Sequence, residues 1–364
     1  MERQISFVVP TLIWTGGAEI AMGRLARELV KNDYRVRILS FGRSSKSNPW
    51  WSQFRDLDSI VEESPDFNSW IANLNFLRLK LTRDKGQIIH SWLYRANLLS
   101  SLVKPKTMPL VWSIRHSLDD LSNESIKTKL GLWGSKVLSR RVDYILFNSQ
   151  RSLKQHEGFG IKSKKDLFIP NGFELKNPST KRESGSSSFT IGHLGRFHPV
   201  KAQMEFIEAL GDLRQHDFQV LMGGRNITPS NGELMKLIQE AGLVNRITLV
   251  GELQDPTEFF SSLDLFCLNS HSEGFPNVVG EAMALGLPCV VTDVGDAAYL
   301  VGDSDLVVPP RDTASLARAI EKMILMPAAQ RLELGQKARK RIEEEFSIER
   351  MVEAHRDLYE KLLG

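Results

Sequence analysis

The sequence has 364 residues, 41% hydrophobic and 25% charged, which suits two α/β domains of about 150 to 200 residues, each with its own core. It holds no run of the roughly 20 apolar residues that a membrane-spanning helix needs, and the Ile5–Val9 run is too short for a signal peptide, so we expect a cytoplasmic protein. Residues 1–180 contain 28 basic and 17 acidic residues, a net of +11, whereas the remainder contains 19 and 27, a net of −8.

Strand-like and helix-like segments alternate along the whole chain. Strands are predicted in the first half at Ile5–Pro10, Arg35–Phe41, Gln87–Trp92, Leu110–Ile114, Val142–Asn148 and Leu167–Pro170. Strands are predicted in the second half at Phe189–Leu194, Phe218–Met222, Arg246–Val250, Leu265–Leu268, Pro288–Thr292 and Asp305–Val308, with helices between them such as Gln203–Leu213. Repeated strand–helix–strand order predicts two parallel sheets, each with helices on both faces.

A polar segment rich in Ser, Pro and Lys, Lys176–Ser188, is typical of a linker. We therefore predict a Rossmann-like N-terminal domain at 1–178 and a Rossmann-like C-terminal domain at 189–345. Doubly wound sheets bind ligands at the carboxyl ends of their strands, so the site is expected in a cleft between the domains. Cys267 and Cys289 lie in apolar runs and are expected to be reduced core residues.

Two segments after predicted strands suit phosphate groups. Gly16 and Gly17 open a helix, where backbone N–H groups and the helix dipole favour an anion, although a simple tight turn is the alternative. Arg196 and Lys201 lie in the loop after Phe189–Leu194, where a guanidinium and an ammonium can neutralise a diphosphate; exposed surface charge is the alternative. The G-x-G-x-x-G fingerprint is absent at Gly16, which disfavours a nicotinamide cofactor.

The segment Glu273–Glu281, with sequence EGFPNVVGE, follows the predicted strand Leu265–Leu268. Pro276 suits the first position of a helix, and Glu273 in the loop and Glu281 in the helix can each accept hydrogen bonds from sugar hydroxyls. Helix capping by Glu273 is the alternative. In the first half, Arg115 and His116 follow a strand and can face a ligand, and His90, near another strand end, is a weaker candidate; a structural histidine is the alternative for both.

The E-x7-E segment Glu273–Glu281, the G-R-x4-K segment Gly195–Lys201, the early Gly16–Glu19 and Pro170-Asn171-Gly172 together resemble family 4 of the retaining glycosyltransferases, which have the GT-B fold. The resemblance spans about residues 5 to 360. Phe173 and Glu174 depart from the Val/Ile-Asp that usually follows in the family, and Asp296 stands after Gly295 where relatives often carry further glycines.

This resemblance implies that the domain at 1–178 binds the acceptor and the domain at 189–345 binds the donor, and it implies a role for each matched position. His116, Arg196, Lys201 and Glu273 would be catalytic, with His116 near the sixth carbon of the donor sugar. The donor would be bound by Gly16, Gly17, Gly195, Arg196, Lys201, Glu273, Gly274, Phe275, Asn277, Val278 and Glu281. The acceptor side would include His90, Arg115 and Asn171, and residues 346–364 would return to pack on the first domain.

The resulting prediction is a retaining transferase that moves a hexose or N-acetylhexosamine from a nucleotide-diphosphate sugar to a saccharide or lipid-linked saccharide, with UDP-sugars favoured and GDP-mannose open. A nucleotide-sugar epimerase of the same fold and a non-catalytic nucleotide-sugar-binding protein are the alternatives. We expect no cofactor and no metal, because Arg196 and Lys201 supply the charge, and the D-x-D matches at Asp56–Asp58 and Asp303–Asp305 are attributed to chance. Scattered basic residues and the absence of a recognised module argue against nucleic acid.

The segment Ile126–Arg141 is a predicted basic amphipathic helix. Ile126, Leu130, Trp133 and Val137 share one face, and lysines and arginines surround them. Such a helix is typical of peripheral attachment to an anionic membrane surface, here on the inner face of the cell membrane, and the net charge of the first half agrees. Packing of the apolar face on the sheet of the first domain is the alternative.

Overall fold

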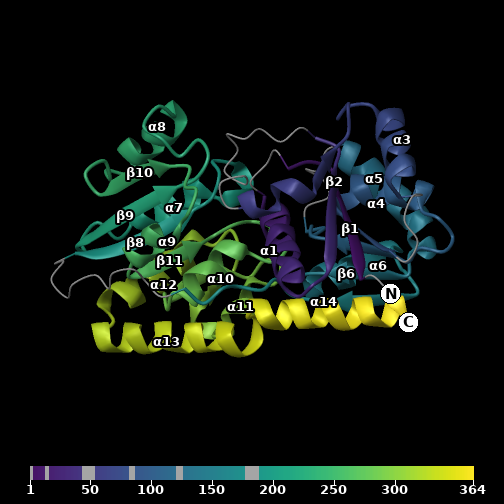
Figure 1. The fold of residues 1–364 in the computed structure, drawn as a ribbon. Coiled ribbons are helices and arrows are strands. Elements are labelled where there is room, and N and C mark those ends of the chain that lie inside the picture. The colour runs from purple at the N-terminus through teal and green to yellow at the C-terminus, as the bar shows by residue number, and fades with distance from the viewer. Residues whose placement is uncertain (1–2, 13–15, 43–53, 82–86, 120–125, 177–187) are drawn as a thin grey trace. The chain divides into compact units, whose positions relative to one another are not determined.

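The chain passes between two structural units after Gly172 and again after Ser347. In the computed structural model, which describes residues 3–12, 16–42, 54–81, 87–119, 126–176 and 188–364, unit 1 comprises Met1–Gly172 and Ile348–Gly364, and unit 2 comprises Phe173–Ser347. The first crossing thus precedes the expected linker, of which residues 177–187 lie outside the described residues. Each unit is built around one parallel sheet (Figure 1).

Unit 1 contains a seven-stranded parallel sheet in the order β3-β2-β1-β4-β5-β6-β7. Every residue of β1, β4 and β5 is buried, and this explains why most of their residues are apolar, because a parallel sheet covered on both faces leaves no side facing solvent. The six strands predicted for this half all have a counterpart, and β3 is additional. The strands are β1 (Gln4–Val9), β2 (Arg35–Ser40), β3 (Val61–Glu63), β4 (Gln87–Trp92), β5 (Leu110–Ile114), β6 (Tyr144–Phe147) and β7 (Lys165–Phe168).

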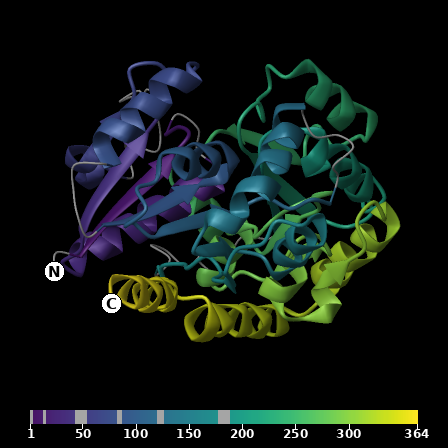
Figure 2. The same cartoon turned by 90° about the vertical axis from the view of Figure 1, so that its right-hand side faces the viewer.

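Helices cover both faces of this sheet. Phe7 and Val9 of β1 pack in one core with α1 (Gly17–Lys31) and α14 (Ile348–Leu363). The intervening Val8 belongs to a second core with α3 (Trp70–Leu81), α4 (Leu93–Val103), α5 (Ile126–Leu138) and α6 (Gln150–Phe159). Successive residues of β1 therefore point to opposite faces of the sheet and pack against different helices. Helices α3, α4 and α5 lie together on one of these faces (Figures 1 and 2).

Unit 2 contains a six-stranded parallel sheet in the order β10-β9-β8-β11-β12-β13 and one core. Its strands are β8 (Phe189–Leu194), β9 (Phe218–Gly223), β10 (Ile247–Gly251), β11 (Leu265–Leu268), β12 (Cys289–Thr292) and β13 (Val307–Val308). Its helices are α7 (Gln203–Gly211), α8 (Gly232–Glu240), α9 (Thr257–Ser261), α10 (Asn277–Ala284), α11 (Ala297–Val301), α12 (Thr313–Leu325) and α13 (Ala328–Glu345).

The six strands predicted for the second half are thus all present, and the expected doubly wound parallel architecture holds in both units. Cys267 and Cys289 are unpaired and buried in β11 and β12, and burial raises the pKa of both thiols. Within the described ranges, none of the helices is both long enough and apolar enough to cross a lipid bilayer.

Candidate functional site

The loop after β8 carries the two predicted cations and is held by side chains of unit 2. Gln203 donates from its amide nitrogen to the Arg196 carbonyl at 2.9 Å, which fixes the first part of the loop. Lys201 ends a short 3₁₀ turn, and the next residue, Ala202, has a φ of 52°, a left-handed conformation that costs energy for a residue with a side chain. Asn269, just after β11, donates to the Ala202 carbonyl at 2.6 Å and so supports this strained position.

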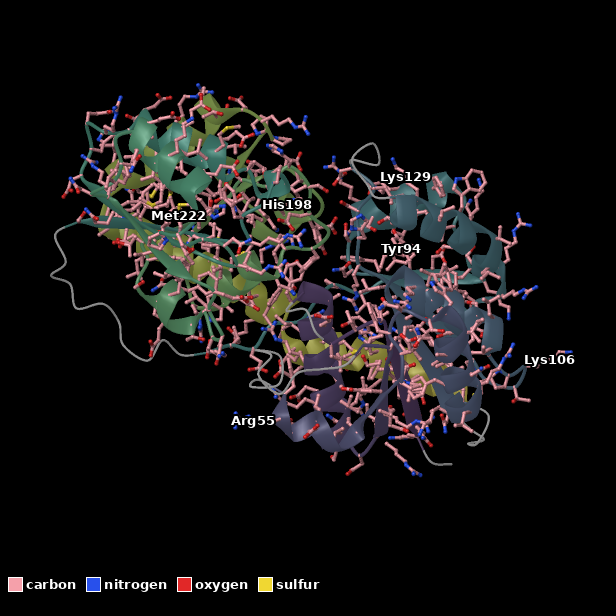
Figure 3. All side chains as sticks on the ribbon, turned by 90° about the horizontal axis from the view of Figure 1, so that it is seen from above. Arg55, Tyr94, Lys106, Lys129, His198 and Met222 are labelled. Carbon is pink, nitrogen blue, oxygen red and sulfur yellow. The ribbon has the colours of Figure 1, made fainter. Side chains whose placement is uncertain are left out.

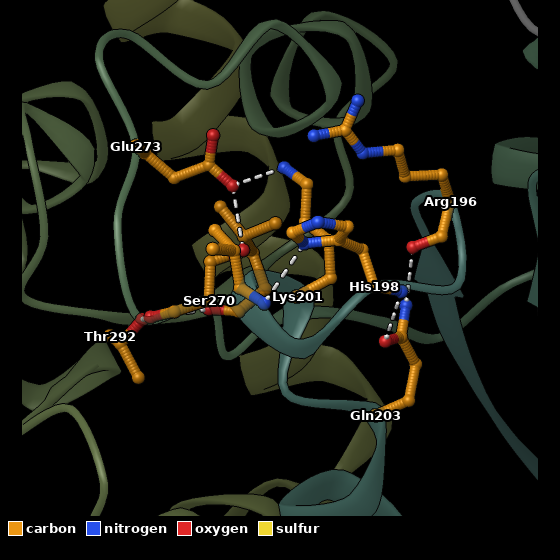
Figure 4. A network of polar contacts seen from close by, with 9 residues as sticks. Arg196, His198, Lys201, Gln203, Ser270, Glu273 and Thr292 are labelled. Carbon is orange, nitrogen blue, oxygen red and sulfur yellow. Dashed lines mark hydrogen bonds and ion pairs between the residues drawn. The ribbon is translucent and has the colours of Figure 1, made fainter. Parts of the chain in front are cut away.

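Lys201 and Glu273 meet at one carboxylate oxygen. Lys201 Nζ lies 2.5 Å from Glu273 Oε1, and the Ser270 hydroxyl donates to the same oxygen at 2.6 Å. Thr292, the last residue of β12, in turn donates to the Ser270 carbonyl at 2.7 Å (Figure 4). The loops after β8 and β11 therefore meet at Glu273, and the end of β12 supports them through Ser270, at the strand edge where doubly wound sheets bind ligands.

The surroundings of Lys201 are electropositive. Arg196 is exposed, and its side chain extends toward the same side of the loop as the Lys201 ammonium (Figure 4). Partial burial and then the charges of Arg196 and Lys201 lower the pKa of His198. The pKa of His193, buried in β8, is lowered to about 4, chiefly by burial and next by Lys201. The charges of Arg196 and Lys201 favour an anionic ligand in this region.

The Glu273 loop leads directly into α10. The helix begins at Asn277, so Pro276 is the residue before the helix and not its first residue, which corrects the sequence-based prediction. Gly295, with a φ of 52°, lies against this loop: a Cβ there would be 2.3 Å from the Glu273 carbonyl oxygen, a distance that only glycine avoids. The amide of Asp296 donates to the Gly274 carbonyl at 2.9 Å, so residues 295 and 296 contact the backbone of the Glu273 loop and stabilise its conformation.

The residues predicted to bind the donor around α10 lie close together, in the loop before the helix and in its first turns. Gly274 and Phe275 lie in the loop, Asn277 and Val278 begin the helix, and Glu281 lies one turn further along it. The first turn of an α-helix presents backbone N–H groups toward its N-terminal end, a position suited to anions. Phe275 is buried and its ring is stacked on Phe173 with 6.2 Å between centroids, so the loop is anchored by an aromatic pair.

In unit 1, Arg115 and His116 line a pocket of about 170 Å³ at the carboxyl ends of β4 and β5. Its other lining residues are Leu93, Tyr94, Ile114 and Thr128. Tyr94 meets the His116 ring edge-on at 6.3 Å. Arg115 lies over the Trp92 ring at 4.1 Å and hydrogen-bonds Asn171, and burial lowers its pKa to about 9. The structure thus brings together three of the predicted residues of this unit, Arg115, His116 and Asn171.

Helix α6 holds the His116 loop in place. The Ser152 hydroxyl donates to the His116 carbonyl at 2.6 Å, and Gln155 accepts from the Leu118 amide at 2.8 Å. His156 has its Nδ1 2.7 Å from the Ser152 carbonyl and its Nε2 2.6 Å from the Tyr94 hydroxyl. Burial lowers the pKa of His156 to about 4, so the ring is neutral, with Nδ1–H donating to the carbonyl and Nε2 accepting from Tyr94.

His90 is a correction to the sequence-based prediction. It is fully buried inside β4, with Nδ1 2.6 Å from the Tyr359 hydroxyl and Nε2 2.8 Å from the Ser113 hydroxyl. Burial lowers its pKa well below the ordinary value, and the ring stacks with His355 at 5.9 Å. This histidine therefore joins α14 to the sheet of unit 1 and has no exposed surface with which to contact an acceptor.

Gly16 and Gly17 stand at the start of α1, as predicted, but with a different partner. Gly16 has an ordinary extended conformation, with a φ of −82°, and its amide donates to the Glu19 carboxylate at 3.1 Å. The Glu19 carboxylate thus gives the Gly16 amide the negatively charged partner that we expected a donor phosphate to provide. The structure therefore gives the Gly16 amide a structural role, and residues 13–15 before it lie outside the described ranges.

The D-x-D matches are engaged in ion pairs. Asp56 accepts from Arg27 at 2.7 and 2.8 Å, and Asp305 accepts from Lys322 at 2.8 Å. In the described part of the chain, no three His, Cys, Asp or Glu side chains are grouped so that they could hold a metal ion.

Several residues that shape these loops were missed by the sequence analysis. They are Tyr94, Ser152, Gln155, His156, Gln203, Asn269, Ser270 and Thr292. The available signal was polar residues directly after an apolar run, as in Asn269 and Ser270 after Leu265–Leu268. The others lie within helices or strands, where sequence gives no such signal.

Comparisons with known proteins agree with this architecture. Residues 15–177 match the family model described as Glycosyltransferase Family 4, and residues 188–325 match the model described as Glycosyl transferases group 1. The chain is 30% identical over 130 residues to the putative glycosyltransferase EpsF of Bacillus subtilis, which is 35% of this chain and 33% of EpsF. It is 29% identical over 185 residues to the capsular polysaccharide biosynthesis glycosyltransferase CapM of Staphylococcus aureus, 49% of this chain and 47% of CapM.

The structural comparison extends over the whole chain. The crystal structure of HepE from Anabaena in complex with UDP superimposes with a TM-score of 0.83 at 21% identity, covering 98% of this chain and 100% of HepE. At this identity the likeness shows the fold, which is GT-B. With a family 4 model on its first half, a group 1 model on its second half and the GT-B fold throughout, the chain belongs to the family 4 type of glycosyltransferases.

Proposed function

We propose that the chain transfers a hexose or N-acetylhexosamine from a nucleotide-diphosphate sugar to a saccharide or lipid-linked saccharide, in the biosynthesis of a cell-surface polysaccharide. The observation that carries the proposal is the Lys201–Glu273 pair, held by Ser270 and flanked by Arg196 on loops of unit 2. CapM, which is named for capsular polysaccharide biosynthesis, supports the pathway class, and HepE, described in complex with UDP, favours a UDP-sugar.

In this proposal Lys201 exchanges partners when the donor binds. Its ammonium, which lies 2.5 Å from Glu273, would turn to the diphosphate, and the Glu273 carboxylate would then accept from hydroxyls of the donor sugar. Arg196 would contact the same diphosphate. Negative charge grows on the leaving phosphate as the donor bond breaks, so these two prepositioned cations stabilise the transition state more than the ground state.

We further propose that the reaction retains the anomeric configuration by front-face transfer. The incoming hydroxyl would give its proton to the departing phosphate oxygen, so that one bond to the anomeric carbon forms as the other breaks on the same face. His116, in the pocket with Arg115 and Tyr94, is the proposed contact to the donor sugar. Glu281 on α10 is the proposed partner of the ribose hydroxyls.

The proposal is tested by binding and then by turnover. Thermal unfolding with UDP, GDP and their sugars should reveal the donor, because a ligand at about 100 times its dissociation constant adds about 2.7 kcal/mol of stability. Lys201→Met should abolish this increase in unfolding temperature. The control is Lys236→Met, which should leave the increase unchanged, because Lys236 is an exposed residue of α8 whose ammonium lies 3.7 Å from Glu240. Equal shifts in both variants would remove the basis of the assignment.

Turnover with the identified donor then separates the alternatives. Transfer to a saccharide acceptor, with an α product from an α donor by proton NMR, supports the proposal. Interconversion of the donor sugar without any acceptor would identify an epimerase, and binding without turnover for all acceptor classes would identify a binding protein.

A further inference from the structure

Helix α5 turns three large apolar side chains outward. Leu130, Trp133 and Val137 are 66%, 62% and 69% exposed, although they form one apolar face. Leu132 and Ser135, by contrast, are buried. The alternative in which the apolar face packs on the sheet is therefore wrong for these three residues.

This orientation is imposed by the packing of α5 on α4. A Cβ at Gly134 would lie 3.0 Å from Leu98 Cδ2, and a Cβ at Gly131 would lie 3.5 Å from Tyr94 Cβ, so the two helices approach closely through small residues. Figure 3 labels Tyr94 on α4 and Lys129 on α5, on this side of unit 1. Rotating α5 to bury Trp133 would push a large side chain toward this close contact, where even a Cβ at Gly134 is tight.

The outward face has an aromatic pair with cations around it. The Trp133 ring meets Phe159 of α6 edge-on at 6.3 Å, and Lys136 Nζ lies 5.5 Å from the centroids of both rings. Lys136, Arg140 and Arg141 are exposed beside it. An amphipathic aromatic side chain next to lysine and arginine matches the boundary between lipid headgroups and acyl chains.

We propose that Leu130, Trp133 and Val137, with Phe159 and the flanking cations, form a docking surface for an anionic lipid bilayer; we name it the α5 outer face. The charges select this occupant. Lys136, Arg140 and Arg141 are exposed on α5 or just after it, within a half of the chain that carries a net of +11, so the surface suits a negatively charged leaflet. A second copy of the chain on the same face would bring identical cations against one another. The inference goes beyond sugar transfer and concerns where the enzyme works, and its test needs neither donor nor acceptor.

The test is sedimentation of the full chain with lipid vesicles. Vesicles containing about 30% phosphatidylglycerol should bind it at least about tenfold more tightly than pure phosphatidylcholine vesicles, and binding should weaken as salt shortens the Debye length from about 10 Å. A triple variant, Leu130→Ser with Trp133→Ser and Val137→Ser, should lose about tenfold or more of this affinity, because burial of apolar surface stabilises interfacial helices.

A matched control replaces exposed leucines elsewhere. Leu325 and Leu332 are 65% and 54% exposed on α12 and α13, and Leu325→Ser with Leu332→Ser should leave vesicle binding unchanged. Circular dichroism and thermal unfolding check that each variant folds. The proposal is overturned if the triple variant binds as the wild type does, if lipid charge has no effect, or if the wild type binds neither vesicle. It is also overturned if the wild type dimerises without lipid through these three residues.

Discussion

Replacing Gly280 by alanine should destabilise unit 2 through a single ring. A Cβ at this position of α10 would lie 2.1, 2.3 and 2.5 Å from three atoms of the Phe173 ring. The closest atom would have to move by about 1.3 Å to reach the 3.4 Å of ordinary van der Waals contact. Phe173 is 1% exposed, its ring is stacked on Phe275, and its amide donates to the Phe346 carbonyl at 2.9 Å. The ring therefore cannot move away from the added methyl group without disturbing its neighbours.

The expected magnitude follows from two opposing effects. Overpacking a core by one methyl group costs about 1 to 3 kcal/mol, whereas glycine to alanine in a helix gains up to about 1 kcal/mol. We therefore expect Gly280→Ala to lower the free energy of unfolding by about 1 to 2 kcal/mol. Phe173→Val alone should also destabilise, by about 2 to 4 kcal/mol, because it leaves a cavity. The double variant should be more stable than the sum predicts by about 1 kcal/mol or more, since the new methyl group occupies part of that cavity.

Urea unfolding of the four proteins of this cycle measures the coupling, with tryptophan fluorescence and circular dichroism compared to detect separate transitions of the two units. Gly232→Ala is the control, because it is the first residue of α8 and a Cβ there meets nothing within 4 Å. Additive effects of Gly280→Ala and Phe173→Val would refute the reasoning. So would a Gly280→Ala protein as stable as the Gly232→Ala protein.

Three further results are expected. Arg196→Ala and Lys201→Ala should each lower turnover by about a hundredfold or more at saturating donor, and unchanged rates would contradict the role of both cations. Folding should become less favourable below pH 6.5, because His156, His193 and His355 have pKa values lowered to about 4, 4 and 3 by burial. The unfolded chain binds the protons, so each histidine removes about 1.4 kcal/mol per pH unit as the pH falls from 6.5 toward 4, and urea titrations at pH 7 and 5 measure the loss; equal stabilities would exclude it. Transfer should continue in excess chelator, and a loss restored by Mn²⁺ or Mg²⁺ would show that a metal is required.

The sheets could be predicted from the sequence because buried parallel strands are short runs of mostly apolar residues. The predicted bounds of β4, β5, β8 and β11 match the structure residue for residue. The strand β3 escaped because it has three residues, two of them glutamates, and lies at the edge of its sheet. Only one neighbouring strand contacts such an edge, so its side chains need not be apolar.

The departure of Phe173 from the family pattern shows what sequence spacing leaves out. From the sequence, Phe173 for valine or isoleucine is a conservative change in a loop. In the structure its ring fills the space that the missing side chain of Gly280 leaves, more than a hundred residues later, and stacks on Phe275 in the Glu273 loop. The two residues are complementary in volume, and neither position is unusual when considered alone.

His90 and His116, two of the four histidines of unit 1, show why the prediction for His90 failed while the residues predicted around His116 came together. His90 is the third residue from the end of β4, and His116 is the second residue beyond β5. Inside a strand, successive side chains point alternately to the two faces of the sheet, and both faces of this sheet are covered by helices, so His90 can only enter a core. Beyond the last ladder hydrogen bond the chain is free of that alternation, and His116 can line a pocket. For a doubly wound fold, the position of a polar residue relative to the strand's last residue is therefore a better guide to ligand contact than the residue type. A shift of four positions, from two before the last residue of β4 to two after the last residue of β5, separates the core residue His90 from the site residue His116.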